Sequence, residues 1–166
     1  MKWLGTLVLV AAGSLAACGA CAQSKALKDD IVGTWKYVSV DLVRPDGTRV
    51  PLYGPDPQGL AAFDAAGNYI LMTARGGQPR FASSNREEGT PEENKAVVQG
   101  SIAHFGRYTI DDAGKLITFH IRTSTFPNWN GTDQKRPVTI SGDTLKWVTP
   151  SSTGAGSAEV VLQRAR

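Results

Sequence analysis

Apolar and polar residues alternate along most of the chain beyond residue 31, and this period of two is typical of half-buried β-strands. The first alternating run covers residues 32–44, is rich in β-branched residues, and ends at the turn sequence Arg-Pro-Asp-Gly-Thr. Further runs, separated by short turns or polar segments, cover residues 50–54, 58–64, 68–73, 106–111, 115–125, 136–141, 144–149 and 158–163. The pattern predicts an all-β domain of about nine strands in up-and-down order, which is the outline of an antiparallel β-barrel.

One segment departs from this alternation. Thr90-Pro91-Glu92-Glu93 combines a capping box with proline at the first helical position, which is a strong signal for a helix start. We expect one inserted α-helix from residue 91 to about residue 104. Its packing face on the barrel would be the stripe formed by Val97, Val98, Ser101, Ile102 and Phe105.

The first 22 residues have the composition of an export signal. Lys2 precedes an apolar segment at residues 3–12, and the Ala- and Gly-rich residues after it fall short of the ~20 strongly apolar residues of a membrane span. Leu15-Ala16-Ala17-Cys18 resembles a bacterial lipobox, in which Cys18 becomes the lipidated first residue of the mature protein. The alternative is cleavage after Ala22, which would leave a soluble periplasmic or secreted protein.

We expect the lipidated form, exported to the periplasm and anchored to the outer membrane. Residue 19 is glycine rather than the aspartate of an inner-membrane retention signal. The chain then divides into a signal and lipobox region at residues 1–22, a polar linker at residues 23–30 and a barrel domain at residues 31–166.

The composition of the chain limits the kinds of partner and cofactor that we expect. Hydrophobic residues make up 41% of the 166 residues, enough for one domain with its own core. The excess of 18 Lys and Arg over 15 Asp and Glu is small and scattered, so we expect no nucleic-acid partner. Both cysteines lie in the export region, and His104 and His120 have none of the usual spacings of a metal site. We therefore expect neither a metal ion nor a cofactor.

A resemblance to a known family becomes visible at Gly33-Thr34-Trp35, a Gly-x-Trp sequence on the first predicted strand. The chain resembles the lipocalin-like domain family of bacteria and fungi over residues 31–164, in the segments VGTWKYVSV, DGTRVPLYGPDPQGL, RFAS, GTPEENKAVVQGSIAHFGRYTID and FPNWNGTDQKR. The resemblance implies a lipocalin-like barrel with an internal cavity, in which Trp35 plugs the closed end. It implies less about chemistry, because this fold serves carriers, inhibitors and a few cyclases or isomerases.

The predicted strand at residues 115–125 offers the best set of polar candidates. His120 and Arg122 lie on one face, whereas Ile117, Phe119 and Ile121 lie on the other, and one of the two faces lines the barrel interior. If the face with His120 and Arg122 points inward, the barrel has a hydrated cavity in which these side chains can bind an anion or a carbonyl group. The alternative is that the apolar face points inward and both polar side chains face solvent.

The same choice arises on the first strand, where Tyr37 and Asp41 share the face of Trp35 and would line the lumen. Val38 and Val40 would then pack outside. Buried charges need partners, so an ion pair between Asp41 and Arg122 is a structural alternative to ligand binding at these two residues.

Two other regions complete the candidate site. Tyr108 is assigned to the cavity or its rim. Phe126 and Trp129 lie in a loop that forms either a lip over the open end or a plug that folds beneath it.

We expect a periplasmic or envelope-anchored binding protein that holds a small hydrophobic or amphipathic ligand in the barrel and meets the membrane through a lipid on Cys18. One alternative is a cavity-based isomerase or cyclase, with His120 as general base and Arg122 and Tyr108 assisting. The other is an envelope interaction or inhibitor module. No hydrolase elbow, phosphate loop or zinc-protease motif occurs to identify a reaction.

Overall fold

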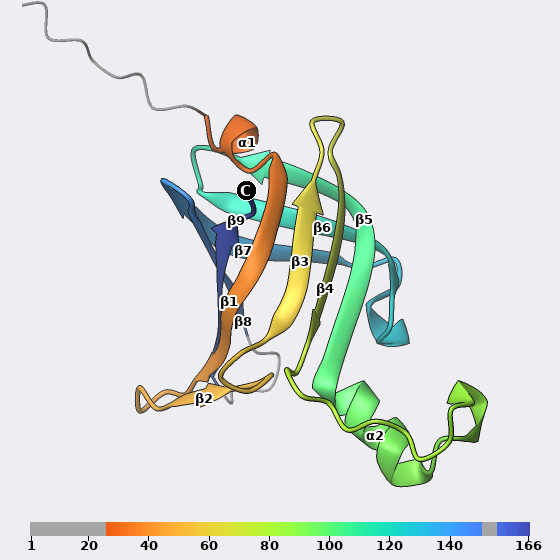
Figure 1. Cartoon of the computed structure of the whole chain (residues 1–166). Coiled ribbons are helices and arrows are strands. Elements are labelled where there is room, and N and C mark those ends of the chain that lie inside the picture. The colour runs from red at the N-terminus through yellow and green to blue at the C-terminus, as the bar shows by residue number, and fades with distance from the viewer. Residues whose placement is uncertain (1–25, 151–155) are drawn as a thin grey trace, which may run out of the picture.

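The computed structural model describes residues 26–150 and 156–166 (Figure 1). Cys18 and the alternative cleavage site after Ala22 lie outside the described residues. Among the helices of the described part, none is long and apolar enough to cross a membrane. The described part also contains no cluster of three or more metal-ligating side chains.

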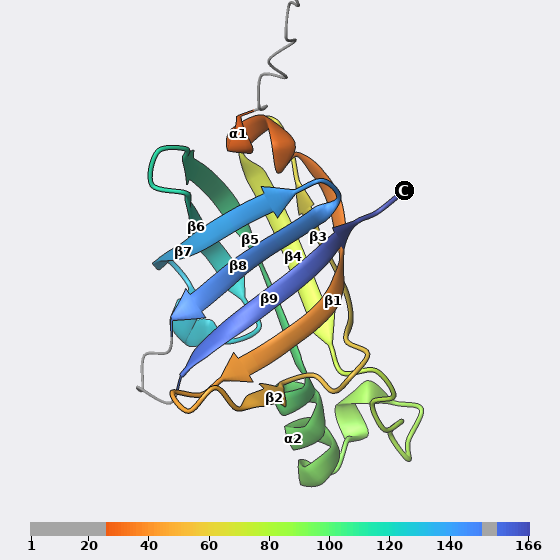
Figure 2. The same ribbon diagram turned by 90° about the vertical axis from the view of Figure 1, so that its left-hand side faces the viewer.

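Within the described ranges, nine antiparallel strands form a single sheet (Figures 1 and 2). They are β1 (Gly33–Val43), β2 (Arg49–Pro51), β3 (Gln58–Phe63), β4 (Asn68–Ala74), β5 (Ser101–Asp111), β6 (Leu116–Ser124), β7 (Asp133–Ser141), β8 (Thr144–Pro150) and β9 (Ser157–Arg164). The helical segments are α1 (Leu27–Asp30), η1 (Arg86–Glu88), α2 (Pro91–Gly100) and η2 (Pro127–Trp129).

The sheet closes because β1 pairs with both β3 and β9. The remaining neighbours follow chain order from β3 to β9, and β2 pairs with the far end of β1 as a short extra strand. The predicted up-and-down barrel of nine strands with one inserted helix is confirmed. The inner face carries alternate residues of each strand, and its buried apolar side chains are Trp35, Tyr37, Val40, Ala61, Phe63, Tyr69, Leu71, Tyr108, Ile117, Phe119, Ile121, Val138, Leu145, Trp147, Val160 and Leu162.

One end of the barrel is covered by α1, which lies in the segment expected to be a polar linker (Figure 2). Leu27 and Ile31 are buried there. The Trp35 indole Nε1–H donates a 2.8 Å hydrogen bond to the Ile31 carbonyl oxygen. The Arg164 guanidinium lies 4.1 Å from a Trp35 ring centroid and donates to the carbonyl oxygens of Val32 and Asp30. Trp35 is therefore an interior plug at the α1 end, as the family resemblance implied.

The inserted helix begins as predicted but ends earlier. The Thr90 hydroxyl accepts from the Glu93 amide, and the Glu93 carboxylate accepts from the Thr90 amide, so the capping box is complete. The helix stops at Gly100 rather than near residue 104, because residues 101–111 pair as β5 with both β4 and β6. The predicted packing stripe is wrong as well: α2 projects from the end of the barrel and Val98 is 74% exposed (Figure 2).

Candidate functional site

The barrel interior is lined mainly by aromatic rings. Phe119 on β6 has its ring centroid 4.8 Å from that of Tyr69, 5.7 Å from Trp147 and 6.2 Å from Phe63. Tyr69 and Trp147 meet Phe119 edge to face, an arrangement that the ring quadrupoles favour. These contacts line the interior with packed aromatic side chains.

A single cation lies among these rings. Arg136 on β7 is 4% exposed, and its guanidinium carbon lies 4.6 Å from the Phe119 ring centroid. Its Nη2 donates a 2.6 Å hydrogen bond to the Gln134 side chain, whereas its Nε has no partner. Within the described chain Arg136 forms no ion pair. Burial lowers the pKa of Arg136 to about 10, so the side chain is still charged at neutral pH.

Next to this cation lies a neutral pair of side chains. The Tyr69 hydroxyl and His104 Nδ1 are 2.7 Å apart, and His104 is 3% exposed. Burial, with a smaller effect from the nearby Arg136 charge, lowers the pKa of His104 to about 3. Burial raises the pKa values of Tyr37 and Tyr69 well above the usual range of tyrosine. The positive charge of Arg136 is therefore not compensated by any of these neighbours.

Three buried polar atoms on the inner face have no hydrogen-bond partner among the described residues: Thr73 Oγ1, Arg136 Nε and Trp147 Nε1. Buried polar groups are nearly always paired with protein or water, because an unpaired one costs about 1–3 kcal/mol. Two of the three atoms are obligate donors. These donors could therefore be satisfied by a hydrogen-bond acceptor that the described residues do not supply.

The expectation that His120 and Arg122 line the lumen is wrong. Ile117, Phe119 and Ile121 point inward and are buried, which is the alternative left open by the alternating pattern. On this strand, the apolar side chains bury their surface in the core while the imidazole and guanidinium keep their contact with water. His120 lies on the outer face and holds Asp133 at 2.8 Å. Arg122 is exposed on that face and has no hydrogen bond or ion pair with any described residue.

Asp41 is also outside the lumen, because of an irregularity in β1. The pairing of β1 with β9 shifts register between Tyr37 and Ser39, which is a β-bulge. Beyond the bulge the opposite set of residues points inward, so Val40 is buried inside. Asp41 instead lies 3.5 Å from Arg49, which also pairs with Glu159 at 3.1 Å. The proposed pair of Asp41 with Arg122 does not form.

The four remaining candidates have mixed positions. Tyr37 points inward, with its ring 6.3 Å from that of Trp147. Tyr108 is buried as well, and its hydroxyl donates a 2.7 Å hydrogen bond to the Asp64 carbonyl oxygen. Trp129 folds against the core. Phe126, which precedes η2, is 45% exposed, so this loop contributes one plug residue and one rim residue.

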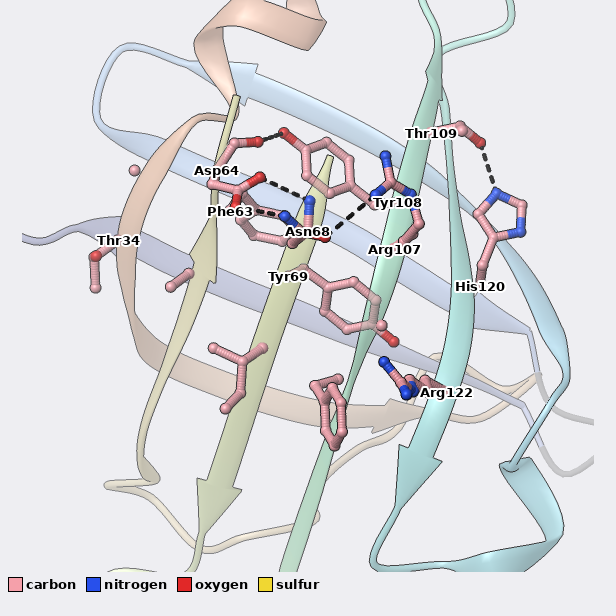
Figure 3. Close-up of a pocket in the computed structure, with 15 residues that line it drawn as sticks. Thr34, Phe63, Asp64, Asn68, Tyr69, Arg107, Tyr108, Thr109, His120 and Arg122 are labelled. Atoms are coloured by element: carbon pink, nitrogen blue, oxygen red, sulfur yellow. Dashed lines mark hydrogen bonds between the residues drawn. The ribbon is translucent and has the colours of Figure 1, made fainter. Parts of the chain in front are cut away.

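A separate hollow lies on the outer face of the sheet, with a volume of about 1000 Å³ (Figure 3). Outward-facing residues of β1, β3, β4, β5 and β6 line it, among them Thr34, Ala62, Ile70, Phe105, Arg107, His120 and Arg122. Of the buried unpartnered polar atoms in the described chain, none belongs to the residues of this hollow. His120 and Arg122 thus border the outer hollow and not the lumen, and the Tyr108 side chain points to the opposite face of the sheet.

Comparison with known proteins decides the family. The family model for a lipocalin-like domain matches residues 32–166 of this chain. The chain belongs to the lipocalin-like domain family. A curated relative, the 4′-hydroxy-3′-methoxypropiophenone carrier protein ppsC of Aspergillus oryzae, is 32% identical over 78 residues, which are 43% of this chain and 70% of the relative.

Solved structures give more distant likenesses to this lipocalin-like chain. A lipocalin-like protein from Bacteroides uniformis is 14% identical with a TM-score of 0.46, covering 82% of this chain and 99% of its own. A variant of the fluorescent protein UnaG is 12% identical with a TM-score of 0.39, covering 82% of this chain and 97% of its own.

The two central groups of the lipocalin-like interior, Arg136 and His104, were not among the residues singled out from the sequence. A signal existed for Arg136, since it shares one face of its strand with Val138 and Ile140, and a cation in an apolar row is a candidate for burial. His104 fell at the end of the predicted helix, where its strand position could not be seen.

Proposed function

We propose that this lipocalin-like barrel binds and carries a small hydrophobic or amphipathic molecule in its interior. The observation that carries the proposal is the set of buried, unpartnered polar atoms on Thr73, Arg136 and Trp147 among aromatic walls. Binding sites for small molecules combine such apolar surfaces with a few fixed polar groups.

The Aspergillus relative supports this proposal. Its name describes a carrier of an aromatic ketone, which joins a ring to a carbonyl acceptor. A molecule of that outline would place its ring beside Phe119 and Trp147 and would turn its oxygen toward the free donors.

The test uses a fluorescent aryl ketone, 6-propionyl-2-dimethylaminonaphthalene, whose emission moves to the blue in apolar surroundings. We expect saturable binding of one dye per chain with a blue shift. Trp147→Phe keeps the ring but removes the indole donor, and one neutral hydrogen bond corresponds to a loss of about two- to tenfold in affinity.

Phe105→Leu in the outer hollow is the matched control and should leave dye affinity unchanged. The absence of saturable binding, or a loss of affinity confined to the control variant, would contradict a ligand site inside the barrel. Native mass spectrometry of the gently purified protein should also show a retained small molecule.

We further propose that the protein is exported and anchored to the outer membrane through a lipid on Cys18. The support is the lipobox-like sequence at residues 15–18 behind an apolar segment. The wild-type protein should fractionate with membranes and need detergent for release, whereas Cys18→Ser should release it into the soluble periplasmic fraction. Cys21→Ser is the matched control and should remain on the membrane. A soluble wild-type protein that begins at Gln23 would show cleavage after Ala22 instead.

A further inference from the structure

We infer that Arg136 anchors the ligand site and that the natural ligand carries an acidic oxygen group, a carboxylate or a phenolate, which pairs with the free edge of this guanidinium. The inference rests on the proposed function and names the class of ligand. The ligand's apolar or aromatic body would lie beside Phe119 and Trp147.

The surroundings of Arg136 leave its charge without a counter-charge. Its neighbours on other strands are Tyr37 on β1, Tyr69 on β4 and Phe119 on β6, and its own strand supplies Gln134. The described chain provides no carboxylate within ion-pair distance of it. A buried charge without a partner is costly in a low-dielectric interior, and a neutral acceptor would satisfy one N–H but leave that charge in place.

Two acidic residues on the outer face of β1 and β9 are engaged elsewhere. Asp41 and Glu159 both pair with Arg49 on the outer face. The guanidinium of Arg136 is also only partly occupied, because Phe119 covers one face and Gln134 takes Nη2, while Nε stays free. Planar guanidinium groups favour oxygen anions, which can accept two parallel N–H bonds.

Other donors lie on the same inner surface. Trp147 Nε1 is buried and unpartnered, and the Tyr37 hydroxyl forms no hydrogen bond with any described residue. The rings of Tyr37 and Trp147 are in contact, with centroids 6.3 Å apart. These groups suit an anion with more than one acceptor position.

The titratable groups around Arg136 do not change charge near neutral pH, which makes the pH dependence of ligand affinity simple to interpret. With the pKa of His104 lowered to about 3, and those of Tyr37 and Tyr69 raised far above neutral, these three groups stay uncharged through the neutral range. Arg136 stays charged up to a pKa of about 10. Between roughly pH 5 and pH 9, any change in affinity therefore reports the ionisation of the ligand.

The experiment compares three probes with the same body: 2-naphthoate, 2-naphthamide and 2-acetylnaphthalene, titrated calorimetrically into the full-length mature protein. We expect the naphthoate to bind at least about tenfold more tightly than either neutral probe, as charge-assisted hydrogen bonds do. Its affinity should stay constant from about pH 5 to pH 9, because the acid's own pKa of about 4 lies below this range. 2-Naphthol, whose hydroxyl ionises only at about pH 10, tests for a phenolate ligand: if the site selects phenolates, its affinity should rise as the pH increases toward about 9.

Arg136→Met should weaken naphthoate binding by at least about tenfold and change naphthamide binding by less than about threefold. Arg122→Met is the matched control, because it removes the same charge from the outer hollow, and it should change neither affinity. Arg136→Lys keeps the charge and should retain the preference for naphthoate.

Equal binding of naphthoate and naphthamide to the wild-type protein overturns the inference while leaving the proposed carrier function intact. Loss of naphthoate binding in Arg122→Met, but not in Arg136→Met, moves the acid site to the outer hollow and also overturns it. If no probe binds at all, the carrier function itself fails. If Arg136→Met does not fold, the comparison of the three probes on the wild-type protein is sufficient to test the inference.

Discussion

Trp35→Ala should lower the free energy of unfolding by about 3–5 kcal/mol, which is the usual cost of truncating a buried tryptophan. Trp35 is fully buried, and its ring packs between the core and the Arg164 guanidinium. Its loss leaves a cavity beneath α1. It also leaves the Ile31 carbonyl oxygen without the indole donor. Urea denaturation followed by circular dichroism measures the effect.

A second substitution at Trp35 helps to separate the contribution of the hydrogen bond from that of the buried ring. Trp35→Phe keeps one aromatic ring but loses part of the buried indole and the 2.8 Å hydrogen bond to Ile31, so it should cost about 1–3 kcal/mol, less than Trp35→Ala. Val98→Ala on the exposed face of α2 is the control and should change stability by less than about 0.5 kcal/mol. If Trp35→Ala behaves like this control, then the α1 end does not belong to the cooperative core of the barrel.

The number and order of the strands could be predicted from the sequence because both depend on local signals. Each strand alternates with a period of two, and each hairpin turn carries its own Gly or Asp residues. The start of α2 also depends on a local signal, since the Thr90 capping box needs only four residues. The end of α2 depends on contacts with other strands. Residues after Gly100 join β5 because β4 and β6 supply hydrogen-bond partners on both sides.

Which face of a strand points inward could not be decided from that strand alone. For β6, both faces were plausible, and the choice depends on the aromatic rings that β4 and β8 bring against Phe119. For β1, a single bulge after Tyr37 reverses the inward set, so that Val40 is inside and Asp41 outside. A one-residue shift of this kind moves every later side chain to the other face.

The burial of Arg136 was difficult to predict from the sequence for a related reason. Arginine is rarely fully buried. Arg136 follows directly after the polar residues 130–135, so its sequence neighbourhood favours the surface. The alternation with Val138 and Ile140 groups Arg136 with apolar residues, and barrel closure then places that face inside. Tyr37 and Tyr108 point inward as predicted, whereas Arg122 lies on the outer surface and the interior holds Arg136 instead.

Acidification from about pH 7 to pH 4 should destabilise the barrel by about 3 kcal/mol through His104 alone. The pKa of this imidazole is about 3 in the folded protein, against about 6.5 when the chain is unfolded. In that interval the unfolded chain binds a proton that the folded chain does not, so stability is complete above about pH 6.5 and is lost progressively as the pH falls toward 3. Each pH unit within the window corresponds to about 1.4 kcal/mol.

The cause of this loss is local, and substitution can isolate it. Protonated His104 would lie with its ring 5.9 Å from the Phe119 ring centroid, buried and close to the Arg136 charge, and no carboxylate of the described residues forms an ion pair with it. In His104→Gln the amide oxygen can still accept from the Tyr69 hydroxyl, and urea unfolding at several pH values should show a much flatter dependence between about pH 6.5 and pH 4. His120→Gln removes the histidine of the outer face and should keep the wild-type slope. A slope that persists in His104→Gln but disappears in His120→Gln would assign the acid sensitivity to the outer surface and not to the buried imidazole.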